Sequence, residues 1–217
     1  MNSNDKANFL QLLRSQKREN IELALQLAKG NAAYQNEIDK LVKIHDALFS
    51  RPLGYSDDLE GELTSKKLSD LNTDFCSYVE NNITYLPAEI DQLIHLTSLH
   101  ISSNSLKELP KEIGHLAKLE ELWMGRNQIT HLPKEIGQLQ NLVYWDLPNN
   151  KIEHLPASIG NLRNLKDLDI SNNQLKSIPQ EVSQLKQLKE LGLEGNPIPE
   201  FEQKKIQDWL PNCKIWF

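Results

Sequence analysis

The chain has 217 residues and a formal net charge of −6, with 30 acidic and 24 basic side chains. This acidic balance excludes a typical nucleic-acid or anionic-membrane partner, because both are bound through an excess of Lys and Arg. The sequence holds no long apolar run, and its first residues lack the charged start and apolar stretch of an export signal. We therefore expect a cytoplasmic protein without a membrane span.

The first 72 residues predict a helical N-terminal cap followed by a linker. Residues 4–15, 18–29 and 31–49 have helical periodicity, and from residue 50 to residue 74 the chain is mixed and acidic. One face of the third helix carries a stripe of side chains spaced by four and three. A partner helix is one use of such a stripe, and packing against the protein's own core is the commoner one. The stripe consists of Tyr34, Ile38, Leu41, His45 and Leu48.

Residues 73–199 form six copies of a unit that repeats every 23 residues, L-x-x-L-x-L-x-x-N-x-L-x-x-L-P-x-x-I-x-x-L-x-x. Each copy opens with period-two alternation, typical of a short strand, and continues with apolar residues three or four apart, typical of a helical or 3₁₀ turn. One unit cannot bury its apolar face alone, so successive copies must stack. We predict an α/β solenoid, curved, with a parallel concave sheet. The full copies begin at Leu96, Leu119, Leu142 and Leu165.

Two columns of the repeat have structural explanations. A chain that leaves a strand inside a stack has backbone groups without partners, and a buried amide side chain satisfies them, so the asparagine column is predicted to be buried. The proline column fits the first helical position of each return arm, where a fixed φ and a missing N–H are tolerated. The columns are Asn81, Asn104, Asn127, Asn150, Asn173, Asn196 and Pro110, Pro133, Pro156, Pro179.

The amino-acid sequence of the return arm resembles that of a known family. Leu109–Leu116 reads L-P-K-E-I-G-H-L, and Leu132–Leu139 reads L-P-K-E-I-G-Q-L. The chain resembles leucine-rich repeat proteins of the 23-residue L-P-x-E-I-G-x-L subtype, which occurs in many bacterial proteins and is similar to the Ras-pathway scaffold and plant intracellular Ras-related repeat proteins. The resemblance implies the fold and a role in binding, but members bind many unrelated partners, so it names none.

Residues 200–217 predict a C-terminal cap, since the open end of a stack exposes apolar surface. A short amphipathic helix covers the last repeat, and residues 212–217 fit a final strand. We assign Trp216 and Phe217 to packing, with an exposed docking tail as the alternative. The helix residues predicted to cover the last repeat are Phe201, Ile206, Trp209 and Leu210.

The two cysteines, Cys76 and Cys213, fall at opposite ends of the predicted stack. At the usual strand spacing they are about 24 Å apart. A disulfide needs Cα atoms within about 7 Å, so we predict two free thiols and a reducing compartment.

The outward strand residues line the concave face, where we place the function. Trp123 and Tyr144 fall in adjacent repeats and are expected side by side, with Arg126 at the strand end, and such residues often anchor interfaces. A surface aromatic that merely stacks on its neighbour is the alternative. Trp145 occupies a Leu position and is predicted to be buried. The predicted partner-binding residues are Phe75, His100, Glu121, Trp123, Arg126, Tyr144, Asp146, Asp167 and Asp169.

We predict a non-catalytic protein-binding module or scaffold whose partner is a protein or peptide, basic and with an apolar anchor. His131 and His154 occupy the same position of adjacent repeats, as a metal pair would, but only Glu108 is placed to join them, so no metal or cofactor is predicted. Three alternatives stay open: a surface recognition domain, self-association through the concave face, and an effector or enzyme-associated protein whose repeats target an activity of residues 1–72.

Overall fold

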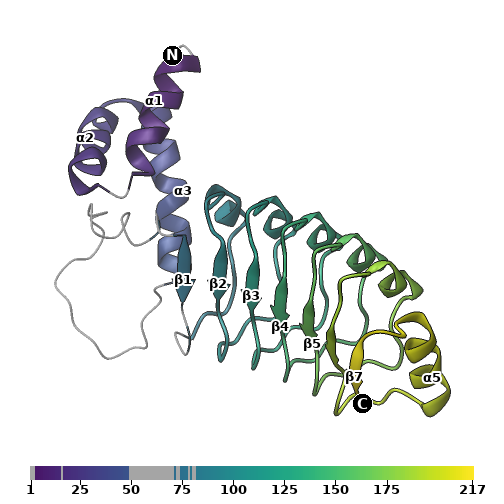
Figure 1. Cartoon of the computed structure of the whole chain (residues 1–217). Coiled ribbons are helices and arrows are strands. Elements are labelled where there is room, and N and C mark those ends of the chain that lie inside the picture. Colours follow the sequence, from purple (N-terminus) through teal and green to yellow (C-terminus); the bar gives the residue numbers. More distant parts are fainter. Residues whose placement is uncertain (1–2, 16, 49–70, 72–73, 78, 80–81) are drawn as a thin grey trace.

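The computed structural model describes residues 3–15, 17–48, 71, 74–77, 79 and 82–217. Three α-helices are followed by short strands that alternate with 3₁₀ turns, and the chain ends with one helix and one strand (Figure 1). The predicted linker lies outside the described residues except for Leu71 and Asp74. None of the helices in the described ranges is long and apolar enough to cross a membrane.

The N-terminal helices are Ser3–Leu13 (α1), Arg18–Ala28 (α2) and Ala32–Leu48 (α3). Four of the five stripe residues predicted on α3 are buried, and the partly buried ring of Tyr34 stacks on Phe9 with 4.0 Å between centroids. Core packing is therefore the use of this stripe. The helices form a single cap on one end of the solenoid (Figure 1).

Two polar contacts join the cap to the first 3₁₀ turn, Ala88–Gln92 (η1). The Lys43 ammonium lies 2.6 Å from the Glu89 carboxylate, and the Arg14 guanidinium donates a hydrogen bond of 2.9 Å to the Gln92 side chain. These contacts fix α1 and α3 against the return arm of the first repeat, so the cap covers an end that would otherwise expose apolar surface.

Within the described part of the chain, seven short strands form one parallel sheet in chain order. Residues that pair on neighbouring strands are one repeat apart in the sequence, as Ser98 and Glu121 are. The last pair differs, because Glu190 and Lys214 are 24 residues apart (214 minus 190). The strands are Phe75–Ser77 (β1), Ser98–His100 (β2), Glu121–Trp123 (β3), Tyr144–Asp146 (β4), Asp167–Asp169 (β5), Glu190–Gly192 (β6) and Lys214–Trp216 (β7).

The return arms are 3₁₀ helices, and each begins one residue later than predicted. Pro133 is extended, with φ −67° and ψ 145°, and precedes the helix instead of opening it. Its carbonyl accepts the first turn's hydrogen bond from the Ile136 amide at 3.1 Å. The fixed φ of proline suits this flanking position equally well, which explains the difference. The remaining turns are Lys111–His115 (η2), Lys134–Gln138 (η3), Ala157–Asn161 (η4) and Gln180–Gln184 (η5).

The asparagine column satisfies backbone groups of two repeats at once. Asn127 accepts a hydrogen bond from the Leu106 amide and donates to the carbonyls of Ile101 and Met124, each at 3.0 Å. Asn127, Asn150 and Asn173 are buried as predicted, Asn104 and Asn196 are partly buried, and Asn81 lies outside the described residues.

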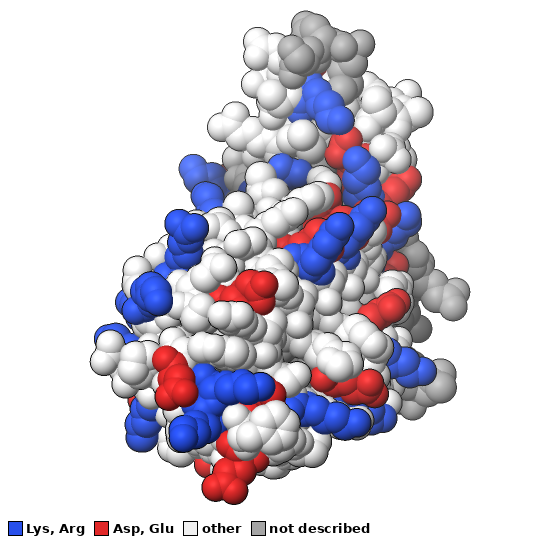
Figure 2. Space-filling view, turned by 90° about the vertical axis from the view of Figure 1, so that its right-hand side faces the viewer, with Lys and Arg blue, Asp and Glu red and all other residues white. Residues whose placement is uncertain are grey.

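The C-terminal cap consists of Glu200–Trp209 (α5) and β7. Ile206 and Leu210 are buried and Trp209 packs against the core, as predicted. The prediction for Phe201 is wrong: its side chain is 63% exposed, because it projects from the first turn of α5 on a different face from Ile206. Charged side chains of both signs are spread over this end of the molecule (Figure 2), which is the polar outer surface that a terminal cap needs.

Candidate functional site: the concave sheet face

The first and third residues of each strand form two columns on the concave face, and the middle residues point into the core. From β2 to β6 the middle residues are at most 1% exposed, and they include Trp145, as predicted. The first column is Phe75, Ser98, Glu121, Tyr144, Asp167, Glu190 and Lys214, and the second is Ser77, His100, Trp123, Asp146, Asp169, Gly192 and Trp216.

The two aromatic residues of the face are diagonal neighbours. The register places Tyr144 opposite Glu121 and Trp123 opposite Asp146, because equivalent positions of parallel repeats lie side by side. The ring contact of Trp123 is instead with His100, at 5.3 Å between centroids and an interplanar angle of 59°. The expectation that Trp123 and Tyr144 lie directly side by side is therefore wrong. Tyr144 is 43% exposed, whereas Trp123 is partly buried between its lateral neighbours.

Two buried polar atoms lie in laterally paired residues of this face. The indole nitrogen of Trp123 and one carboxylate oxygen of Asp146 are shielded from solvent and have no hydrogen-bond partner among the described residues. Burial, together with the smaller effects of the nearby charges of Asp169 and Asp167, raises the pKa of Asp146 to about 6. Asp146 thus carries a charge that its surroundings disfavour.

The acidic half of the face consists of Asp146, Asp167, Asp169 and Glu190, on three neighbouring strands. The pKa of Asp167 is also raised, first by burial and then by Glu190 and Asp169. Within the described ranges, none of these four carboxylates forms an ion pair. Like charges directly opposite one another destabilise a sheet, so the arrangement as a whole is unfavourable for folding, although Asp169 accepts a hydrogen bond of 2.9 Å from the Ser171 amide.

The remaining predicted residues lie around this centre. Glu121 accepts a hydrogen bond of 3.0 Å from Ser98 and lies 3.7 Å from His100 Nε2. Arg126 is exposed beyond the end of β3. Its backbone φ is +56°, in the left-handed region that residues other than Gly, Asn and Asp rarely adopt. The side chain of Phe75 lies outside the described part of the structure.

Lys214 and Trp216 complete the two columns, and neither is among the residues predicted to bind a partner. The Lys214 ammonium lies 4.4 Å from the centre of the Trp216 ring. The step of 24 residues from β6 to β7 breaks the period of 23, so counting by period did not place them on the face. Phe217 packs against the core as predicted, whereas Trp216 belongs to the face.

His131 and His154 are exposed on the return arms, away from the concave face. Among the residues that the structure describes, no three His, Cys, Asp or Glu side chains gather as metal ligands would.

The family model for the leucine-rich repeat region matches residues 70–145 and 135–207. The chain belongs to the leucine-rich repeat family. Leucine-rich repeat domains are typically protein-binding modules and are generally non-catalytic. No curated protein sequence matches this leucine-rich repeat chain.

Solved leucine-rich repeat structures share the fold. A leucine-rich repeat protein of Leptospira interrogans is 36% identical with a TM-score of 0.57, and the match covers 70% of this chain and 45% of that one. An internalin of Listeria monocytogenes has the same TM-score at 24% identity, over 68% of this chain and 42% of the other.

A leucine-rich repeat ectodomain of a plant membrane receptor kinase from Arabidopsis thaliana, in complex with CASPARIAN STRIP INTEGRITY FACTOR 2, is 35% identical with a TM-score of 0.53, over 58% of this chain and 16% of the other. The chain spans less than half the length of each of these three solved proteins.

Proposed function

We propose that the concave face binds a protein or peptide partner. An apolar or aromatic group of the partner docks on Trp123 and Tyr144, and basic side chains lie over Asp146, Asp167 and Asp169. The leucine-rich repeat family supports the general role, and the Arabidopsis ectodomain is a member of similar fold that was solved with a bound protein factor.

The observation that carries the proposal is the row of like-charged carboxylates beside two aromatic side chains. Asp146 pairs laterally with Asp169, and Asp167 with Glu190, so each carboxylate has a like charge on a neighbouring strand, and Glu190 alone also has a cation, Lys214, opposite it. Bringing basic groups to this row removes a repulsion that the free protein bears at neutral pH. An unfavourable local arrangement of this kind is expected at functional sites and not in purely structural parts of a fold.

The aromatic residues supply the second part of the interface. Tyr144 presents a large exposed ring on a rigid strand, and its side chain loses little conformational freedom when a partner covers it. Trp123 offers part of its ring face next to His100. Aromatic residues that lie at the centre of an interface commonly supply much of the binding energy.

The aromatic part is tested by capturing a partner with immobilised protein and then measuring its affinity for purified variants. Trp123→Ala/Tyr144→Ala is expected to weaken binding by about 30-fold or more, since truncating central aromatics commonly costs about 2 kcal/mol. Tyr85→Ala is the matched control, because Tyr85 is 55% exposed but lies on a return arm. Equal binding by all three proteins contradicts the proposal.

The electrostatic part is tested separately with Asp146→Asn/Asp167→Asn/Asp169→Asn. We expect weaker binding and a shallower dependence of the affinity on salt concentration, because neutral side chains remove the charge attraction. Glu108→Gln/Glu153→Gln, at exposed positions of the return arms, controls for two of the three negative charges that the triple variant removes. An unchanged salt dependence in the triple variant rules out the basic flank.

A further inference from the structure

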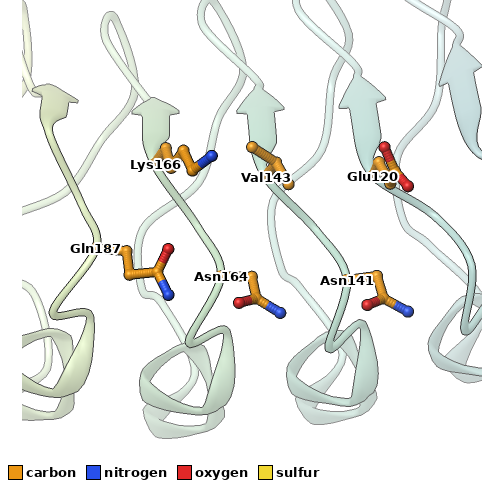
Figure 3. Close-up of a pocket in the computed structure, with 6 residues that line it drawn as sticks. All are labelled: Glu120, Asn141, Val143, Asn164, Lys166 and Gln187. Atoms are coloured by element: carbon orange, nitrogen blue, oxygen red, sulfur yellow. The ribbon is translucent and has the colours of Figure 1, made fainter.

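The edge of the sheet where the strands begin carries a shallow hollow of about 230 Å³, distinct from the concave face. It lies across three return arms at the points where they enter the strands, and Figure 3 shows its side chains in two rows. An upper row lies at the bases of the strands, and a lower row of amides lies nearer the 3₁₀ turns. The lining residues are Glu120, Asn141, Val143, Asn164, Lys166 and Gln187.

Two of the three amides of the lower row, those of Asn141 and Asn164, are held in a fixed orientation. Asn141 donates a hydrogen bond of 2.7 Å to the Ala117 carbonyl, and Asn164 donates one of 2.7 Å to the Gln140 carbonyl. Each side-chain nitrogen therefore points to the preceding repeat, and each oxygen points to the following one (Figure 3). The oxygens remain as hydrogen-bond acceptors for a ligand that brings N–H groups.

Positive charge gathers at the C-terminal part of this edge. Lys166 and Lys189 occupy the same position of adjacent repeats, directly before β5 and β6, and are about 4.8 Å apart at their backbones by strand spacing. Arg163 and Lys186 are exposed in the return arms of the same two repeats. Over the described residues, none of these four cations takes part in an ion pair. A local basic excess in a chain of net charge −6 is not explained by composition.

We propose that this edge binds an acidic, extended segment of a protein partner. Carboxylates of the segment pair with Lys166 and Lys189, and its main-chain N–H groups donate to the side-chain oxygens of Asn141 and Asn164. Glu120 closes the other end of the hollow and repels acidic side chains there, so the carboxylates lie on the side of β5 and β6. A segment that crosses from β3 to β6 spans about 14 Å, which four or five extended residues cover.

The chemistry of the hollow favours a peptide over a nucleic acid. The fixed amide oxygens accept hydrogen bonds, and a phosphodiester backbone has no N–H donor to offer them. This surface has the opposite charge to the concave face, so the inference goes beyond the function proposed above and does not rest on it.

The test uses a fluorescent octapeptide of alternating Glu and Gly, with its Gln–Gly counterpart as the neutral probe, and measures binding to the full chain by anisotropy at low salt. Wild type is expected to bind the acidic probe and not the neutral one. Lys166→Glu/Lys189→Glu is expected to weaken binding by about tenfold, since each reversal removes an exposed ion pair and adds a repulsion. Lys166→Gln/Lys189→Gln, the gentler substitution, is expected to weaken it by about threefold.

Lys107→Glu/Lys176→Glu is the matched control, because it makes the same charge change at exposed lysines of the return arms. It should bind the acidic probe nearly as wild type does, and so should Trp123→Ala/Tyr144→Ala, which separates this edge from the concave face. The proposal is overturned if wild type does not bind the acidic probe, if the control loses as much affinity as Lys166→Glu/Lys189→Glu, or if a single-stranded oligothymidine competes as strongly as the peptide.

Discussion

Asp146 shows how one residue on the concave face links protonation to stability. Its carboxyl lies between the strands of Trp123 and Asp169, and its pKa of about 6 stands above the ordinary value of 3.8. The folded protein therefore holds a proton in a pH range where the unfolded chain has lost it. Stability is unaffected by this group below about pH 4 and decreases as the pH rises through 6.

Asp146→Asn is expected to raise the free energy of unfolding at pH 7.5 by about 1 kcal/mol, because it removes the unfavourable charge, and water that reaches part of the carboxyl keeps the gain small. At pH 4 the variant and wild type should be equally stable. Urea denaturation at both pH values measures the difference. A stability difference that is the same at pH 4 and pH 7.5 contradicts the assignment.

The raised pKa of Asp146 also affects the binding of a basic partner. A partner that places a basic group against Asp146 favours its charged form, so binding should release a proton bound by free protein near pH 6. Affinity for a basic partner is then expected to fall as the pH drops below 6.

At the level of elements, the short helix α5 has one face buried against the last repeat and another face exposed to solvent. Ile206 is fully buried against the last repeat, and Phe201 lies outside, where its ring is 5.2 Å from the Lys205 ammonium. A terminal cap depends on its buried face and tolerates change on the other one.

Ile206→Ala is expected to lower the free energy of unfolding by about 2–4 kcal/mol, through lost apolar burial and the cavity left behind. Phe201→Ala should change it by about 0.5 kcal/mol or less, because the side chain is exposed. Chemical denaturation of the two variants beside wild type gives both values. Comparable losses would mean that Phe201 also covers the last repeat.

Elements built on periodicity were predictable from the sequence. A period of 23 fixed the strands, and alternation within each strand placed Trp145 inside and Tyr144 outside. The same period also predicts the lateral neighbours, because His100, Trp123 and Asp146 are spaced by one repeat; the expectation that Trp123 lies beside Tyr144 did not follow this spacing, whereas the ring contact with His100 does. The hollow at the sheet edge was also missed, because it combines residues of three arms that only the stacked structure brings together.

At the scale of the whole molecule, the stack keeps its two ends apart. Cys76 lies on β1 and Cys213 directly precedes β7, at opposite edges of the sheet, and both are free thiols. Burial, together with the smaller effects of the charges of Glu190 and Asp167, raises the pKa of Cys213 to about 11, so its reactive thiolate is scarce at neutral pH.

Both thiols are expected to react with iodoacetamide in denatured, unreduced protein, giving two adducts by mass spectrometry. In the native protein at pH 8, Cys213 should react about 100-fold more slowly than an exposed cysteine of ordinary pKa, which follows from its lower thiolate fraction. Recovery of an intramolecular link between the two cysteines contradicts the stacked arrangement.

The hydrogen bonds of the asparagine column bear on the order in which the repeats fold. The amide of Leu106 is satisfied by Asn127, 21 residues further along, and Ile129, Ile152 and Leu175 depend in the same way on the asparagine of the following repeat. On the ribosome, where the N-terminal end emerges first, each new repeat therefore waits for the next one before its loop closes. Each loop is thus completed one repeat behind its own synthesis, and the series ends with Asn196, which accepts the hydrogen bond from the Leu175 amide.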